Sequence, residues 1–216
     1  MNKNEEDTIQ KKKIRISAIL LAAGNSTRFG SENKLLWHYG QKPMYQYAME
    51  LFSNWKKEED QEDEICVKDL ICVSQYDTLL KAAVQNRMKP VKNKKSDLGI
   101  SYSIQLGIEA CKETDAFLFF VCDQPNLKVE TLKKMSRRAV DLSKKGLIWI
   151  VCAGKEGQPR NPAIFSAFFK KELQNLSGDI GGKQLIRKYP QYVWVCEAAE
   201  EQELIDFDQK SSFFES

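Results

Sequence analysis

The chain's 216 residues suffice for one α/β domain, and its 33 basic and 30 acidic residues leave a net charge of +3, a smaller excess than nucleic-acid-binding faces usually carry. No apolar run reaches about 18 residues and the polar segment 1–13 has no apolar centre, so we expect neither a membrane span nor a signal peptide. Six cysteines without a Cys-x-x-Cys pair, together with a single histidine, argue against a zinc site and indicate a reduced, cytoplasmic protein.

Residues 1–13 are predicted to be a polar tail and residues 14–216 a single domain in which strands and helices alternate. The apolar runs predict strands at 14–21, 70–74, 89–92, 117–122, 147–152, 162–165 and 192–197. Helices are predicted at 43–55, 78–86, 100–111, 129–144, 167–176 and 181–188. This alternation favours an α/β fold with a mostly parallel central sheet and helices on both faces, whose ligands bind at the carboxyl ends of the strands.

The first strand ends in small residues, Ala22, Ala23 and Gly24, and two cations follow, Arg28 and Lys34. Because small side chains leave the backbone N–H groups accessible, this pattern suits a polyphosphate, which needs several donors. The spacing matches neither G-x-x-x-x-G-K-[ST] nor G-x-G-x-x-G. An ordinary glycine turn with solvated charges is the alternative.

A second apolar strand ends in Asp123, followed by Gln124 and Pro125. Its carboxylate would lie at the same sheet edge as the first loop, facing bound phosphates, and is therefore a candidate Mg²⁺ ligand. A turn or helix-capping role for Asp123 is the alternative. Near the C-terminus, Asp206 and Asp208 offer two more carboxylates for the metal, unless they belong to an acidic tail.

Together these stretches resemble a known family. Residues 21–30 with Lys34 resemble the signature of nucleotidyltransferases, and the segments 97–107, 122–125, 157–162 and 176–182 are similar to those of molybdenum-cofactor cytidylyltransferases. The resemblance runs from residue 14 to residue 208 and implies a Rossmann-like nucleotidyltransferase fold. Two departures are Gln105, where the family often has Arg, and the tail sequence after Asp208.

The resemblance also implies roles for individual residues. Those implied in nucleotide binding are Leu21, Ala22, Ala23, Gly24, Arg28, Lys34, Gly99, Ser101 and Ser103. Those implied in catalysis are Lys34, Arg28 and Asp123, with Asp123 and Asp208 as Mg²⁺ ligands. Those implied on the acceptor side are Gln158, Asn161, Gly178, Asp179 and Gly181.

The activity that the resemblance implies is Mg²⁺-dependent transfer of CMP from CTP to molybdopterin, with release of pyrophosphate and a molybdenum hydroxylase as the client of the product. Ala23 resembles the cytidylyl-transferring branch, since guanylyl-transferring relatives have glycine there. Two alternatives are a nucleotidyltransferase that uses GTP or a sugar or polyol phosphate, and a non-catalytic protein that binds or inserts molybdenum cofactor.

Overall fold

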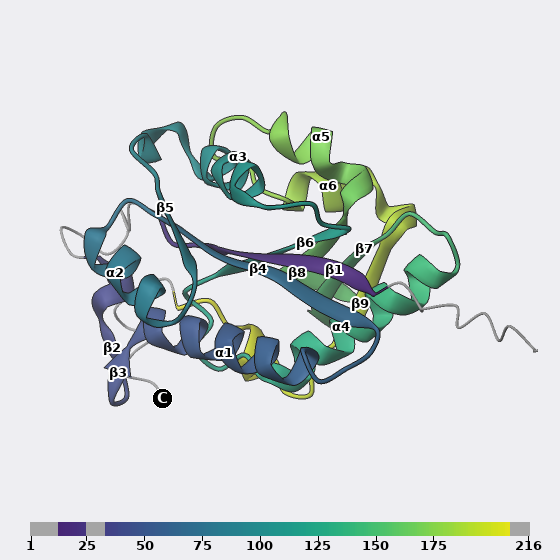
Figure 1. Ribbon diagram of the computed structural model, residues 1–216, viewed down its shortest axis with the longest axis horizontal. Coiled ribbons are helices and arrows are strands. Elements are labelled where there is room, and N and C mark those ends of the chain that lie inside the picture. The colour runs from purple at the N-terminus through teal and green to yellow at the C-terminus, as the bar shows by residue number, and fades with distance from the viewer. Residues whose placement is uncertain (1–12, 25–32, 208–216) are drawn as a thin grey trace, which may run out of the picture.

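The computed structural model describes residues 13–24 and 33–207 (Figure 1). Within these residues one seven-stranded sheet has the order β5-β4-β1-β6-β8-β7-β9. Its strands are β1 (Ile14–Leu21), β4 (Ile65–Ser74), β5 (Lys89–Lys92), β6 (Ala116–Val121), β7 (Ile150–Lys155), β8 (Gln158–Ser166) and β9 (Val193–Glu197). Neighbouring strands are parallel except at β8, which is antiparallel to both β6 and β7. The predicted α/β fold with a mostly parallel sheet is confirmed.

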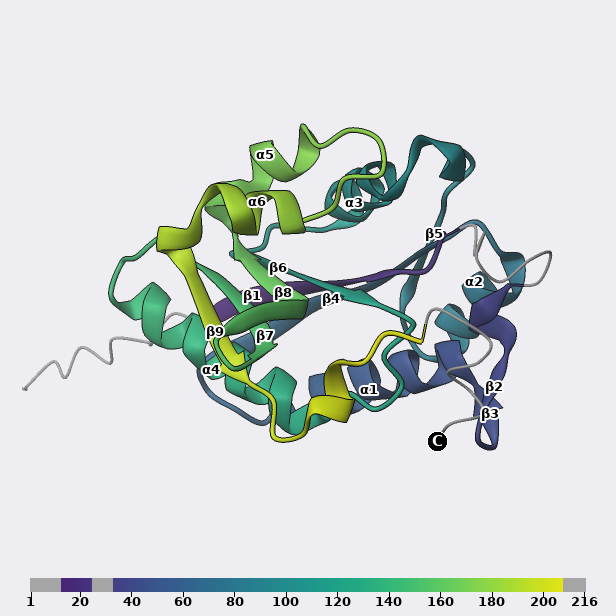
Figure 2. The ribbon, with the colours of Figure 1, turned by 180° about the vertical axis from the view of Figure 1, so that it is seen from behind.

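Helices cover both faces of this sheet (Figures 1 and 2). One face carries α1 (Met44–Glu59), α2 (Asp77–Gln85) and α4 (Val129–Lys144), and the other carries α3 (Ile100–Ala110), α5 (Lys170–Gln174) and α6 (Lys183–Lys188). Among the described residues, no helix has both the length and the apolar character needed to cross a membrane.

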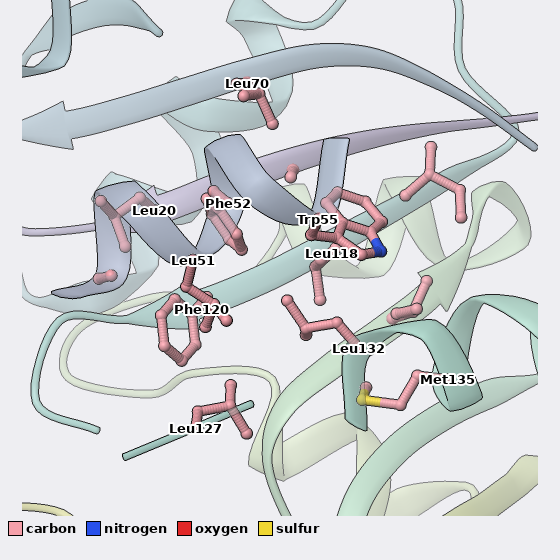
Figure 3. Packing of buried hydrophobic residues seen from close by; sticks show 14 of the residues in the cluster. Leu20, Leu51, Phe52, Trp55, Leu70, Leu118, Phe120, Leu127, Leu132 and Met135 are labelled. Atoms are coloured by element: carbon pink, nitrogen blue, oxygen red, sulfur yellow. The ribbon is translucent and has the colours of Figure 1, made fainter. Parts of the chain in front are cut away.

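Side chains of the central strands alternate between two cores. In β6, Leu118 and Phe120 pack with α1 and α4, whereas Phe117 and Phe119 pack with α3 and α5. Figure 3 shows the first core, in which the fully buried Trp55 lies among side chains of α4 and β6. Burial on both faces explains why β6 is an unbroken apolar run in the sequence, as expected for a central strand of such a sheet.

The order of the strands creates a switch point between β1 and β6. The chain moves outward from β1 to β4 and β5, and then returns to place β6 on the other side of β1. Leu21, the last residue of β1, is level with Val73 of β4 and Val121 of β6. The loops that follow these strands therefore meet at one edge, where ligands of open α/β sheets bind.

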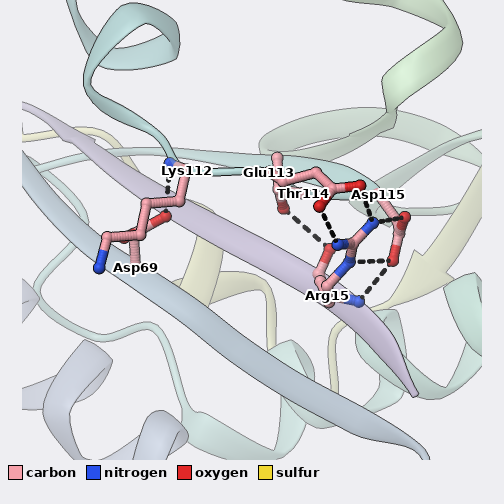
Figure 4. Close-up of polar contacts among 6 residues, drawn as sticks. All are labelled: Arg15, Asp69, Lys112, Glu113, Thr114 and Asp115. Atoms are coloured by element: carbon pink, nitrogen blue, oxygen red, sulfur yellow. Dashed lines mark hydrogen bonds and ion pairs between the residues drawn. The ribbon is translucent and has the colours of Figure 1, made fainter. Parts of the chain in front are cut away.

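At the opposite end of β1, polar contacts join the strands (Figure 4). Arg15 donates through Nε and a terminal nitrogen to the Asp115 carboxylate, while the Asp115 backbone N–H donates to the Arg15 carbonyl. The Asp69 carboxylate accepts from Ser17 Oγ and from the Lys112 backbone N–H. Charged groups at this edge thus bond to one another and to the backbone, as structural groups do.

Several element boundaries differ from the sequence prediction. Strand β4 begins five residues before the predicted 70–74, because Ile65 and Val67 are buried although Lys68 and Asp69 interrupt the apolar run. Helix α1 continues to Glu59, whose side chain is buried. The predicted helix 167–176 is a 3₁₀ turn (Ala167–Phe169) followed by α5. A hairpin of two-residue strands, β2 (His38–Tyr39) and β3 (Lys42–Pro43), was not predicted.

Candidate active site

The backbone that follows β1 is held by side chains from the end of β4. Three consecutive carbonyl oxygens accept hydrogen bonds from three consecutive side chains: Ser74 Oγ donates to Ala22 at 2.8 Å, Gln75 Nε2 to Ala23 at 2.9 Å and Tyr76 Oη to Gly24 at 2.9 Å. Burial raises the pKa of the Tyr76 phenol, so the hydroxyl keeps the proton that it donates.

These contacts fix the direction of the neighbouring amides. In a trans peptide the C=O and the following N–H point in opposite directions, so the N–H groups of Ala23 and Gly24 face away from the end of β4. A Cβ atom built on Gly24 would meet no atom of the described residues within 4 Å. Amides turned in this way, with open space beside Gly24, can donate to an anion.

Lys34 and Asp123 meet at this edge of the sheet. Lys34 opens the 3₁₀ turn η2 (Lys34–Leu36), where the Asn33 side chain accepts a hydrogen bond from the Leu35 N–H. Asp123 lies two residues after the end of β6. Lys34 Nζ lies 2.6 Å from Asp123 Oδ2, and the two side chains are 16% and 15% exposed. The fold therefore brings a cation and an anion from separate loops into one largely buried pair.

The second oxygen of Asp123 fits a role in metal binding. Asp123 Oδ1 is buried, with no hydrogen-bond partner in the described part of the chain. A buried carboxylate oxygen without a donor is a suitable ligand for a hard cation such as Mg²⁺. Across residues 13–24 and 33–207 there is no cluster of three or more metal-ligating side chains, so phosphate and water would have to complete the coordination.

The C-terminal segment packs against the Asp123 turn. The backbone N–H of Phe207 donates to the Asp123 carbonyl at 2.9 Å, and Gln124 Nε2 donates to Asp206 Oδ1 at 2.8 Å. The Phe207 ring packs edge-on against Tyr39 of the β2–β3 hairpin, with centroids 4.9 Å apart. The predicted residues Arg28 and Asp208 lie outside the described residues.

The predicted nucleotide and acceptor segments touch at Gly99. This glycine has φ +83°, and a Cβ there would lie 2.4 Å from the carbonyl atoms of Gly178. Only glycine permits both that conformation and that approach. The Ser101 N–H donates to the Gly178 carbonyl at 3.3 Å. Ser103 is 4% exposed, and its hydroxyl accepts from Asn93 Nδ2 at 3.0 Å.

A pocket of about 250 Å³ opens between these segments and the sheet. The predicted residues that line it are Leu21, Asn161, Asp179 and Gly181. Apolar side chains such as Phe119 and Phe165 form much of the rest, and Lys183 adds a cation. The pairing of β7 with β8 skips residues 161 and 162, and this irregularity sets Asn161 off from the regular ladder. Gln158 is exposed at the start of β8 and is not a lining residue.

A sequence profile of the MobA-like NTP transferase domain matches residues 18–193. The chain belongs to this family and is a nucleotidyltransferase. A comparison with curated protein sequences found no match.

Solved structures that include nucleotidyltransferases share the fold. A nucleotidyl transferase from Methanothermobacter is 19% identical, with a TM-score of 0.72 over 93% of this chain and 94% of that one. Rv0371c from Mycobacterium tuberculosis in complex with manganese is 17% identical, with a TM-score of 0.66 over 93% and 98%. CTP:phosphocholine cytidylyltransferase from Streptococcus pneumoniae is 15% identical, with a TM-score of 0.63 over 94% and 97%. One of these structures thus holds a divalent metal.

Some residues around this nucleotidyltransferase site were missed in the sequence. Ser74, Gln75 and Tyr76 carry no catalytic signature, although the end of the predicted strand 70–74 already placed them at the ligand edge. Lys183 lies within the predicted helix 181–188 and therefore did not stand out as a site residue. In the structure it is the first residue of α6.

Cys122 and Cys72 are poorly suited to act as nucleophiles. Cys122 precedes Asp123, and burial raises the pKa of its thiol well above the usual value. Burial also raises the pKa of Cys72 to about 12. Because the thiolate is the nucleophilic form, these two cysteines are inert near neutral pH.

Proposed function

We propose that this nucleotidyltransferase transfers CMP from CTP to molybdopterin and releases pyrophosphate. The observation that carries the proposal is the meeting, at one sheet edge, of amides turned away from the end of β4, the Lys34–Asp123 pair and the Asn161–Asp179 pocket. The first two groups suit a triphosphate with its metal, and the pocket suits an acceptor.

The base and ribose of CTP would lie on residues 21–24, with Gly99, Ser101 and Ser103 beyond them. Ala23 supports a cytidine nucleotide, as the resemblance to the cytidylyl-transferring branch implies. The amides of Ala23 and Gly24 would donate to the nucleotide.

The acceptor would lie in the pocket beside Asp179. An apolar wall that includes Phe119 and Phe165 suits the faces of a flat ring, and Asn161 and Asp179 offer oxygens to N–H groups at the ring's edge. These features support a pterin as the acceptor. Gln158, Gly178 and Gly181 would complete the acceptor side.

In the reaction, an oxygen of the terminal phosphate of molybdopterin attacks the α-phosphorus of CTP, and the bond from that phosphorus to the β-phosphate oxygen breaks. Pyrophosphate carries away the electron pair. Both reactants are anions, so the protein aligns them and neutralises charge, and it needs no nucleophilic side chain. Lys34 would stabilise charge at the α-phosphoryl group, and Arg28 charge on the leaving pyrophosphate.

Asp123 would hold Mg²⁺, with Asp208 as the second carboxylate. The buried Oδ1 of Asp123 supports its role as a metal ligand. The role of Asp208 is the one that the family resemblance implies. When bound, the ion neutralises phosphate oxygens. The dinucleotide product would then pass to a molybdenum hydroxylase.

Pyrophosphate release tests this proposal directly. The full chain is incubated with Mg²⁺ and each of the four nucleoside triphosphates, with and without molybdopterin. We expect release with CTP that requires molybdopterin. Preference for GTP, or release with a sugar or polyol phosphate in place of molybdopterin, would identify a different transferase. Binding of CTP without release would identify a cofactor-binding protein.

A further inference from the structure

Gln105 joins α3 to the end of α5. These two helices lie side by side on one face of the sheet (Figures 1 and 2). The Gln105 side chain is half-buried, and its Nε2 donates to the carbonyl of Gln174 at 2.9 Å and to that of Leu176 at 2.8 Å. One side-chain amide thus bridges two backbone acceptors that are about seventy residues away in the chain.

These acceptors mark the end of a short helix. Gln174 is the last residue of α5, and Leu176 follows two residues later. The final carbonyls of a helix have no partner within the helix and need donors from elsewhere. Gln105 supplies a donor to the last helical carbonyl, that of Gln174, and to the Leu176 carbonyl just beyond the helix. It therefore fixes the point from which the chain continues into residues 177–182.

The N-terminus of α3 holds this segment at a second point. The Ser101 N–H donates to the Gly178 carbonyl, and residues 101 and 105 are one helical turn apart. Gly99 brings the backbone of Gly178 close enough to exclude a Cβ atom. Helix α3 therefore fixes the segment at both Leu176 and Gly178.

The segment so held carries part of the pocket wall. Asp179 and Gly181 line the pocket of about 250 Å³, and Asp179 is the residue next to the tethered Gly178. We infer that Gln105 is a positioning residue for the acceptor: its two hydrogen bonds hold residues 177–182 where Asp179 can meet the acceptor. This inference rests on the proposed function, and it assigns Gln105 to acceptor affinity rather than to nucleotide affinity.

Gln105→Glu tests this assignment, because it keeps the side chain's shape but replaces the donor with a carboxylate that repels both carbonyls. We expect the KM for molybdopterin to rise on the order of 10-fold, while kcat and the Kd for CTP stay nearly constant. Hydrogen exchange of the 177–182 amides should become faster, with little change elsewhere. Gln105→Arg, which keeps N–H donors, should recover most of the acceptor affinity.

The matched control is Glu109→Gln, the reverse exchange at an exposed site one turn further along α3. It should leave KM and exchange unchanged. Unaltered KM and exchange in Gln105→Glu would overturn the inference, as would an equal loss of CTP affinity. If wild-type protein releases no pyrophosphate, the proposed function fails, and the exchange measurement alone still decides whether Gln105 tethers the segment.

Discussion

Lys34 and Asp123 neutralise each other in a largely buried pair, although each is suited to a different part of a metal–nucleotide complex. A phosphate would be a new partner for Lys34, and a divalent cation would be a new partner for Asp123. Binding one without the other would leave a buried charge uncompensated, which is unfavourable. We therefore expect nucleotide and metal to bind as a unit.

Lys34→Ala should lower turnover on the order of 10²–10³-fold, the cost of removing one preorganised donor from a transition state. Steady-state pyrophosphate release, measured at saturating CTP, checks this. Lys57→Ala, at an exposed position near the end of α1, is the matched control. Unchanged turnover with weaker CTP binding would show that Lys34 only binds the ground state.

Gln75→Glu should weaken CTP binding by roughly 10-fold, because the donor that turns the Ala23 carbonyl away from the nucleotide side is lost. Turnover at saturating CTP should change much less. Calorimetric titration with CTP measures the effect, and Gln191→Glu, at an exposed position before β9, serves as the control. Equal affinities of Gln75→Glu and wild type would show that the held carbonyl does not matter.

Helices α1 and α4 enclose a carboxyl group within their contact. The Glu59 side chain is 1% exposed and accepts a hydrogen bond from Trp55 Nε1 at 2.9 Å. Burial raises the pKa of Glu59 above its ordinary value of 4.5. Above pH 4.5 the folded protein thus retains a proton that the unfolded chain has released. The stability that this carboxyl contributes is therefore fully present below pH 4.5 and is lost as the pH rises through the pKa of Glu59 in the folded protein.

Glu59→Gln should consequently be more stable, relative to wild type, at about pH 7.5 than at about pH 4.5. An amide avoids the cost of a buried negative charge, whereas at low pH both side chains are neutral. Urea unfolding at the two pH values measures the difference, with the exposed Glu109→Gln as reference. An equal difference in the free energy of unfolding between variant and wild type at both pH values would contradict the raised pKa of Glu59.

How far the sequence predicts each element depends on how the element is stabilised. Strands β1 and β5 have the predicted bounds. For β1, the apolar run in the sequence coincides with the hydrogen-bonded length of the strand. The prediction for β4 is too short because Lys68 and Asp69 lie within the strand. The Asp69 carboxylate accepts a hydrogen bond from Ser17 on the neighbouring strand β1. A two-residue hairpin such as β2–β3 is too short to leave a periodic signal.

How far the sequence predicts the site also depends on which contacts hold its residues in place. Lys34 and Asp123 could be placed at one edge from the sequence, because carboxyl ends of parallel strands converge there. The tethers from Gln75 and Gln105 could not, because each joins a side chain to the backbone of a distant segment, and backbone carbonyls have no sequence signature.

Across the whole molecule, the two ends of the sheet differ in what their charged groups bind. At the amino end, Arg15 and Asp115 join β1 to β6. At the carboxyl end, the Lys34–Asp123 pair leaves one buried carboxylate oxygen without a partner in the described residues. We therefore propose that a metal–nucleotide complex binds at the carboxyl end and is held there by Asp123.

Mn²⁺ affinity in the presence of CTP tests this claim most directly, measured by electron paramagnetic resonance of free Mn²⁺. The variants are Asp123→Asn, after β6, and Glu113→Gln, an exposed carboxylate before the same strand. We predict that Asp123→Asn weakens Mn²⁺ binding by at least about 10-fold and that Glu113→Gln leaves it unchanged. Equal affinities of Asp123→Asn and wild type would contradict the account.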